Sequence, residues 1–368
     1  LNINGTTVTA TLTDNLELSG YGISTSNTVE PSSWASISGT SYNLSTTVAT
    51  EGTYYLWVKD SAGNKTTKEF TISLGTSFET LMVANNSDIF DENGLRYEGT
   101  NPNNYICLDN QKSGNCTSSS LLFRIIGLFD EDTSSDGTNS SGTKKLLKVI
   151  DTNNYGGTSG KYWDSSTGKN NWSTASLKIE LNGTYLTSLL KTSNVNSKLS
   201  SGISIAKWHL GGASYSYYNT LTAEGIYTQE RNTRAVYSGN PSSIYAKVGL
   251  MYPSDYGYAT VGGSTTNKSS CRSTTLNYWG VPSYSDCTNN DWLFTSQGSF
   301  VNSEEWLLSP CSSESNLVAY LNSTGDVILS GTSTGNNKSA VRPTFYLDSS
   351  MLKIVGGTGT SSDPYHIG

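Results

Sequence analysis

The N-terminal part of the chain alternates apolar and polar residues in short runs separated by polar turns. Residues 8–12 and 54–58 show this two-residue period, which places successive side chains on opposite faces of a strand. The polar segment 60–64 is typical of a turn, and residues 67–72 supply a further strand. The pattern therefore predicts a small β-sandwich that ends within residues 74–77.

Beyond this boundary the apolar runs become longer. Residues 121–129 are almost continuously apolar, which is typical of a central strand, and residues 105–107 and 146–150 form shorter runs. Residues 130–143 are rich in Asp, Ser, Thr, Asn and Gly and predict an exposed loop. The pattern indicates a sheet in the interior of a second, larger domain.

Two segments have a helical period instead. Ser173 can cap a helix that runs to residue 190 with an interruption at Gly183, and its apolar face consists of Leu177, Leu181, Tyr185 and Leu189. Residues 222–234 predict a second helix or turn, in which we expect surface or interdomain ion pairs among Glu224, Glu230, Arg231 and Arg234. Helices within a mostly β chain predict an α+β fold.

Residues 303–347 combine three pieces in order. Ser303 can cap a short turn in which Glu304 and Glu305 suit a helix N-terminus, and Pro310 ends it. The apolar runs 317–321 and 327–329 flank a polar loop that contains Gly325, which predicts a hairpin. Residues 341–347 predict a closing strand.

These three pieces resemble the C-terminal core of bacterial surface domains with a C-type-lectin-like fold. With residues 124–127, residues 170–172 and an apolar strand that enters a turn at Pro253, the resemblance extends over 78–368 to the large exported domain of Firmicute surface proteins. It implies a twisted antiparallel sheet with two helices and a place on the cell surface. We therefore expect a mainly β, α+β chain with a lectin-like, ligand-binding domain over residues 76–368.

The N-terminal sandwich carries a second resemblance. Gly52 and Tyr54 precede an alternating strand, and Leu56 follows the tyrosine by two residues. This resembles the tyrosine corner of immunoglobulin-like sandwiches, where antibody domains carry Cys in place of Leu56. It implies an immunoglobulin-like module over residues 1–75, similar to the stalk modules of bacterial surface proteins, with any other small β-sandwich as the alternative.

Composition narrows the classes of function. The 368 residues carry a formal charge of -7, only 14% are charged, and no basic run of five residues occurs, so nucleic acid is not an expected partner. No apolar run approaches the roughly 20 residues of a membrane helix, so we expect no membrane insertion.

The cysteines favour an extracellular location. Cys107 and Cys116 flank one short loop, Cys271 and Cys287 flank another, and Cys311 is left over. We predict one disulfide for each loop, which is typical of exported proteins, with reduced structural thiols as the alternative.

Motifs for catalysis are missing. The sequence contains no nucleophile elbow, zinc-protease, phosphate-loop or dinucleotide motif. His209 and His366 are isolated, and Cys311 lacks the second thiol pattern that a formylglycine-generating enzyme on a lectin-like scaffold would need. Asp130, Glu131, Asp132 and Asp136 suit calcium but lack the order of an EF-hand loop, so a solvated hairpin tip is favoured. We predict no enzyme and no cofactor, with calcium left open.

Aromatic and amide residues gather in and beside the loop between Cys271 and Cys287. Exposed Tyr and Trp rings next to Asn and Ser make good recognition surfaces, because rigid rings give contact area at low entropy cost. The calcium-dependent lectin triplets Glu-Pro-Asn and Trp-Asn-Asp do not occur here. The predicted ligand-binding residues are Tyr278, Trp279, Tyr284, Asn289, Asn290, Asp291 and Trp292.

The alternative is that some of these rings fill the core beneath a long insertion. If they bind a ligand, Trp279→Ala or Tyr284→Ala weakens binding and leaves the fold intact. The sequence as a whole predicts a bacterial cell-surface adhesin or ligand-binding protein that recognises a host or neighbouring-cell glycan or protein. An enzyme of unrecognised type and a structural surface-layer or stalk component are the alternatives.

Overall fold

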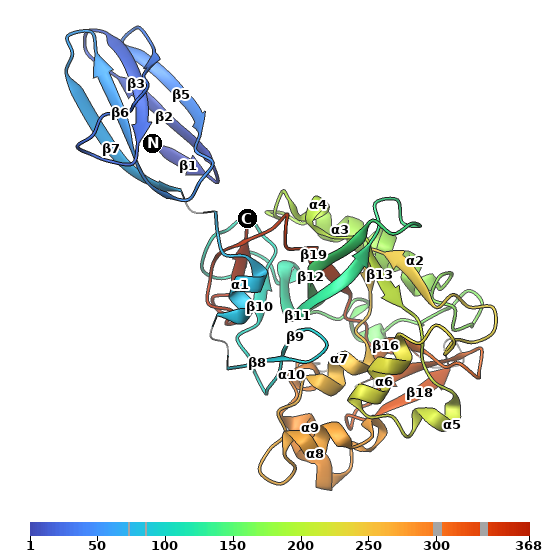
Figure 1. The fold of residues 1–368 in the computed structure, drawn as a ribbon. Helices are drawn as coiled ribbons and strands as arrows, with labels where there is room; N and C mark the ends of the chain where they lie inside the picture. The colour runs from blue at the N-terminus through green and yellow to red at the C-terminus, as the bar shows by residue number, and fades with distance from the viewer. Residues whose placement is uncertain (73, 85–86, 297–303, 332–337) are drawn as a thin grey trace. The chain divides into compact units, whose positions relative to one another are not determined.

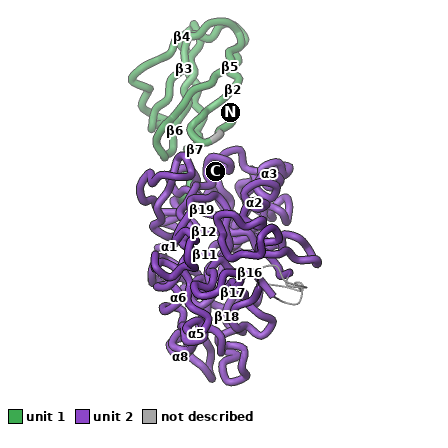
Figure 2. The backbone as a smooth tube through the Cα atoms, turned by 90° about the vertical axis from the view of Figure 1, so that its right-hand side faces the viewer, with its two compact units in different colours: residues 1–76 green, residues 77–368 purple. Residues whose placement is uncertain are grey.

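The chain folds into two compact units, Leu1–Thr76 and Ser77–Gly368 (Figure 2). The computed structural model describes all residues except 73, 85–86, 297–303 and 332–337. Antiparallel sheets dominate both units, which confirms a mainly β, α+β chain.

Unit 1 is built from two sheets. One has the order β1-β2-β5 and the other β4-β3-β6-β7, and a core that includes Val8, Leu44 and Phe70 lies between apolar faces of their strands. The alternating runs of the sequence form these strands as predicted. The strands are β1 (Asn2–Asn4), β2 (Thr7–Thr13), β3 (Leu18–Ser24), β4 (Ala35–Ser36), β5 (Ser41–Thr47), β6 (Gly52–Asp60) and β7 (Lys65–Ile72).

Tyr54 closes a local turn in unit 1. Its hydroxyl donates a hydrogen bond to the carbonyl of Thr50 at 3.1 Å and lies 2.6 Å from the Thr50 hydroxyl. Leu56, two residues further on, is 2% exposed. The tyrosine therefore ties the start of β6 to the segment that precedes it.

Unit 2 is organised around a large sheet whose main path is β15-β19-β12-β11-β10-β21-β20 (Figure 1). Its longest strand, β11, pairs with β12 and β10 and also with β9 and β13 at its edges. The strands are β8 (Ile89–Asp91), β9 (Leu95–Tyr97), β10 (Tyr105–Cys107), β11 (Leu122–Thr133), β12 (Gly142–Asp151), β13 (Ala206–His209), β14 (Ser243–Ala246), β15 (Val248–Gly249), β19 (Thr344–Asp348), β20 (Ile354–Gly356) and β21 (Tyr365–Ile367).

The loop expected at 130–143 is confirmed for residues 134–141 and wrong at both ends. Strand β11 continues to Thr133, β12 begins at Gly142, and Glu131 pairs in register with Lys144. Asp130 pairs in register with Lys145, whose Nζ lies 3.5 Å from its carboxylate, and such an opposite-charge pair across two strands stabilises the extension of the hairpin. Glu131 is consequently 6% exposed, whereas Asp130 beside it faces solvent.

The predicted long helix is present in two segments, α2 (Ser176–Glu180) and α3 (Leu186–Leu190), but Ser173 does not cap it, because the N-cap position is Ala175. A π-helical turn at Leu181–Tyr185 joins them at the position of Gly183, so the chain stays helical there. The Asn182 side chain accepts hydrogen bonds from the backbone N–H groups of Lys247 and Val248. The extra residue of the π turn thus occurs where the helix holds a strand of the sheet.

The second predicted helix is α6 (Ala223–Glu230). Unit 2 contains more short helices than the two that the resemblance implied. The others are α1 (Phe78–Val83), α4 (Leu199–Gly202), α5 (Tyr215–Tyr218), α7 (Pro253–Tyr258), α8 (Lys268–Ser273), α9 (Ser285–Asn289) and α10 (Trp292–Thr295), with 3₁₀ turns at Ser119–Leu121, Gly157–Ser159, Leu276–Tyr278 and Pro282–Tyr284. None of the described helices is long and apolar enough to cross a membrane.

Pro253 begins the helix α7 and does not form the expected turn. Its fixed φ suits the first helical position, where a backbone N–H is not needed. Asp255 completes this start, because its carboxylate accepts a hydrogen bond from the N–H of Tyr252 at 2.8 Å.

The C-terminal hairpin is confirmed, since β17 (Leu317–Leu321) pairs with β18 (Val327–Gly331). The turn expected at 303–310 is wrong, because β16 (Glu305–Pro310) pairs with β17 there. Both carboxylate oxygens of Glu305 lie 2.8 Å from the buried Arg342 guanidinium, and this pairing favours a strand over a capped turn. The predicted cap Ser303 lies outside the described residues.

Candidate functional site

Both predicted disulfides are present. Cys107 is bonded to Cys116 and Cys271 to Cys287, while Cys311 is a free, buried thiol. The second disulfide closes the loop in which we expected a binding surface.

Three of the predicted binding residues are buried. Trp279 and Trp292 are both 0% exposed, and their indole N–H groups donate to the carbonyls of Cys271 and Tyr97. Asp291 caps α10 by accepting hydrogen bonds from Leu293 and Phe294, and burial raises its pKa well above the usual range. The expectation that these side chains lie at the surface is wrong, because the rings fill the core beneath the loop.

The other predicted residues lie nearer solvent. Tyr278 is 53% exposed and packs edge to face on the half-buried Tyr284, with ring centroids 5.9 Å apart. Asn289 is exposed, and the half-buried Asn290 bonds to Asp286 and Thr100. Binding by this smaller surface stays a prediction.

His366 has a structural environment. Its Nδ1 lies 3.2 Å from the buried Asp109, and its Nε2 lies 2.9 Å from the carbonyl of the exposed Gly114. Asp109, His366 and Cys107 are close enough together to suit a metal, but the Cys107 sulfur belongs to a disulfide. In the described chain this is the one such group, and it contains none of the acidic residues considered for calcium.

A polar cleft of about 530 Å³ lies beside β11, and we name it the Glu131 cleft. Side chains from α1, the β8–β9 hairpin, β11, β12, the end of β13 and α6 line it. Its acidic side chains are Glu79, Asp91, Asp130 and Glu131, and its basic or titratable ones are Lys145, His209 and Arg231.

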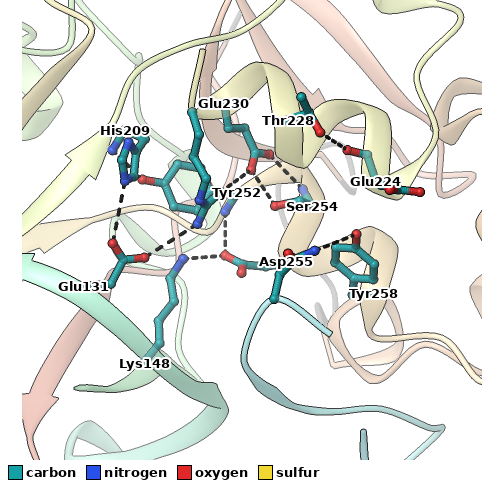
Figure 3. A network of polar contacts seen from close by, with 12 residues as sticks. Glu131, Lys148, His209, Glu224, Thr228, Glu230, Tyr252, Ser254, Asp255 and Tyr258 are labelled. Atoms are coloured by element: carbon teal, nitrogen blue, oxygen red, sulfur yellow. Dashed lines mark hydrogen bonds and ion pairs between the residues drawn. The ribbon is translucent and has the colours of Figure 1, made fainter. Parts of the chain in front are cut away.

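Glu131 from β11 and His209 from β13 face each other in this cleft (Figure 3), and Arg231, directly after α6, lies beside them. The Glu131 carboxylate lies 3.7 Å from Nε2 of His209 and 3.6 Å from Nη2 of Arg231. The side chain of Glu131 is 7% exposed, and those of the other two are 22% exposed. A buried carboxylate therefore faces a cleft with two donors near it.

Both distances are longer than a hydrogen bond. Within the described chain, no hydrogen bond within 3.5 Å reaches the Glu131 carboxylate, although an ionised carboxylate accepts up to about four. Buried polar groups normally have hydrogen-bond partners, so an unfilled carboxylate at the wall of a cleft indicates a place for a ligand or water.

Glu230 lies next to these three residues, and its carboxylate has close hydrogen-bond partners. Its carboxylate accepts bonds from the N–H and the hydroxyl of Ser254 at 3.0 and 2.5 Å, and Arg231 lies 3.3 Å away. Burial raises the pKa of Glu230 to about 7. We expected surface ion pairs here, and this expectation is wrong for Glu230, which is 0% exposed.

Asp255 is a second buried acid whose carboxylate has close partners. Its carboxylate lies 2.5 Å from Nζ of Lys148 and 3.2 Å from Nη1 of Arg96, and all three side chains are nearly inaccessible. Burial opposes ionisation of Asp255, but Lys148 and Arg96 outweigh it and hold its pKa below the usual value. Asp255, Lys148 and Arg96 thus form a cluster of buried ion pairs next to the cleft, where the Arg96 guanidinium lies 4.6 Å from the centre of the Phe129 ring.

Sequence reasoning treated His209 as isolated because its partner lies far away in the chain. Strand β13 brings it to Glu131, and the Tyr252 hydroxyl accepts the backbone N–H of His209 at 2.7 Å. The only local sign of this site in the sequence is the adjacent pair Glu230 and Arg231, which belongs to the same network of contacts.

Searches of protein-family models, of curated proteins and of solved structures found no match to this chain.

Proposed function

We propose that this chain is an exported, non-catalytic ligand-binding protein of a bacterial cell surface, with unit 2 as the binding domain. The Glu131 cleft is its binding site. The observation that carries the proposal is the carboxylate of Glu131, which is nearly buried, lines the cleft and receives no hydrogen bond from the described chain. Buried acids such as Glu230, Asp255 and Glu305 accept close hydrogen bonds, whereas Glu131 at the wall of the cleft accepts none within the described part of the chain, and such a carboxylate provides a site for a polar ligand.

The disulfides support export, because such bonds persist in oxidising compartments. The Tyr54–Thr50 hydrogen bond supports an immunoglobulin-like assignment for unit 1. The antiparallel sheet, the helices packed with it and the β17–β18 hairpin support a C-type-lectin-like assignment for unit 2. On this assignment, unit 1 serves as a stalk for the binding domain.

The chemistry of the cleft favours binding over nucleophilic catalysis. This preference concerns catalysis by a Ser, Thr or Cys nucleophile, because the described lining contains carboxylates, an amide, an amine, a guanidinium, an imidazole and a phenol but none of these three residues. Donors and acceptors within one concave site suit a glycan or protein segment from a host or neighbouring cell.

A binding screen with the full chain tests the proposal. Wild type, Glu131→Gln and Glu314→Gln are applied to a glycan array and to extracts of host-cell surface proteins. Glu314 is exposed and outside the cleft, so its substitution controls for the loss of one negative charge. We expect ligands retained by wild type and Glu314→Gln to be lost with Glu131→Gln. Retention by all three variants, or by none, would overturn the proposal.

A further inference from the structure

The Glu131 cleft has an excess of negative charge. Glu79, Asp91, Asp130 and Glu131 are opposed by Lys145 and Arg231, which leaves a formal charge of -2 when His209 is counted as neutral. The buried cluster of Asp255, Lys148 and Arg96 next to the cleft has two cations on one carboxylate and adds a formal charge of +1, so the cleft and this cluster together keep a formal charge of -1. A ligand that enters this site meets a negative potential.

Neither basic side chain of the cleft donates a hydrogen bond to the Glu131 carboxylate. Nζ of Lys145 lies between Asp130 and Glu79, at 3.5 and 3.7 Å. The Arg231 guanidinium is 3.7 Å from the centre of the Tyr227 ring and 3.3 Å from Glu230. Arg231 is therefore shared among these partners, and its Nη2 forms an ion pair with Glu131 at 3.6 Å without a hydrogen bond.

A ligand ammonium group can donate the hydrogen bonds that the Glu131 carboxylate lacks. It carries a positive charge and three donors, whereas the Glu131 carboxylate provides acceptors and a charge. The exposed carboxylates of Asp91 and Asp130 lie in the same lining and add attraction at longer range.

The remaining groups of the cleft favour a saccharide over a lysine side chain. His209, Arg231 and the exposed Asn93 can each donate a hydrogen bond, and a lysine side chain brings only methylene groups beside its ammonium. An amino sugar places hydroxyl groups next to its amine and can pair with both donors and acceptors. The volume of about 530 Å³ lies within the range of about 300–1,000 Å³ that is common for small-molecule sites.

We infer that the Glu131 cleft binds a saccharide with a free amino group, whose ammonium rests on the carboxylate of Glu131. The inference rests on the proposed function and specifies its ligand class.

Calorimetric titration of the full chain at low salt tests it with a matched pair of probes. One is a β-1,4-linked glucosamine tetramer, and the other is the same tetramer with every amine acetylated. We expect the amine form to bind at least about tenfold more tightly, as for a hydrogen bond to a charged group. Glu131→Gln should remove this preference, whereas Glu314→Gln should keep it.

Asp91→Asn provides a second variant, because Asp91 is exposed and its substitution does not disturb the core. It should weaken binding of the amine form by about two- to fivefold, in line with exposed ion pairs, and leave the acetylated form unchanged. Physiological salt should likewise weaken only the amine form.

Three results would overturn the inference. Equal binding of both tetramers, weakened alike by Glu131→Gln, would leave the proposed function standing and remove the amine. Tighter binding of tetralysine than of the glucosamine tetramer would replace the saccharide by a basic peptide. Failure of both tetramers to bind would reject the amino sugar, and the array screen would then decide the proposed function separately.

Discussion

The loop closed by Cys271 and Cys287 and the Glu131 cleft use their conspicuous residues in opposite ways. The loop is rich in aromatic residues, yet Trp279 lies in the core and donates a hydrogen bond to Cys271. The cleft is assembled from ordinary charged residues, yet it leaves the carboxylate of Glu131 without a hydrogen bond from the described chain. On our proposal, a buried carboxylate that lines a cleft without a hydrogen bond is a better guide to a binding site than a loop rich in aromatic residues.

The largest expected effect concerns the loop. Trp279→Ala should lower the free energy of unfolding by about 3–5 kcal/mol, because it leaves a cavity where a fully buried ring was packed. Urea denaturation measures this change. A stable variant with impaired ligand binding would instead restore the surface role that the sequence suggested.

The disulfide of the same loop gives the next effect. Cys271→Ala combined with Cys287→Ala should cost about 3 kcal/mol, because the cross-link restricts the unfolded chain over a separation of 16 residues. Thermal and urea unfolding under non-reducing conditions measure the loss. Unchanged stability would mean that the loop is held by packing alone.

Glu230 should make stability depend on pH. Its folded pKa of about 7 exceeds the ordinary value of 4.5, so the folded protein retains a proton that the unfolded chain loses between these values. The free energy of unfolding should therefore fall by about 3 kcal/mol from this group as pH rises from about 4.5 to 7.

Glu230→Gln isolates this contribution from that of Asp151, whose pKa burial raises to about 6 in the same direction. Urea unfolding at several pH values should give a flatter profile for the variant than for wild type. Parallel profiles would show that Glu230 has an ordinary pKa in the fold.

The smallest effect is expected at the rim of the loop. Tyr278→Ala should change stability by less than about 0.5 kcal/mol, because the ring is 53% exposed. The contrast with Trp279→Ala, the adjacent position, is a matched comparison in the same assay. A large loss for Tyr278→Ala would show that its edge-to-face contact with Tyr284 supports the loop.

Local patterns carried much of the fold. The alternating run at 54–58, the apolar run at 121–129, the helical face from Leu177 to Leu189 and both disulfides all appear as predicted. Each depends on residues close together in sequence or on a short loop, so its signal is readable without the rest of the chain.

The wrong predictions have one cause in common, because each concerns a side chain whose partner lies far away in the sequence. Glu305 lies in a strand, where Arg342 pairs with it. Glu131 and His209 are close together only because β13 pairs with β11. The direction of Trp279 likewise depends on the core beneath its loop. Such side-chain directions are set by tertiary packing, which no spacing in this sequence expresses.

The most direct test of the central claim needs no ligand. Glu131 and Glu305 are both buried acids, but only Glu305 has close hydrogen bonds to an arginine, at 2.8 Å. Urea unfolding of Glu305→Gln should show a loss of about 3–5 kcal/mol, as for a broken buried ion pair. Glu131→Gln should stay within about 1 kcal/mol of wild type, because on our proposal its carboxylate serves a ligand and contributes little to the free fold. An equal loss in both variants would contradict this account and make Glu131 a structural residue.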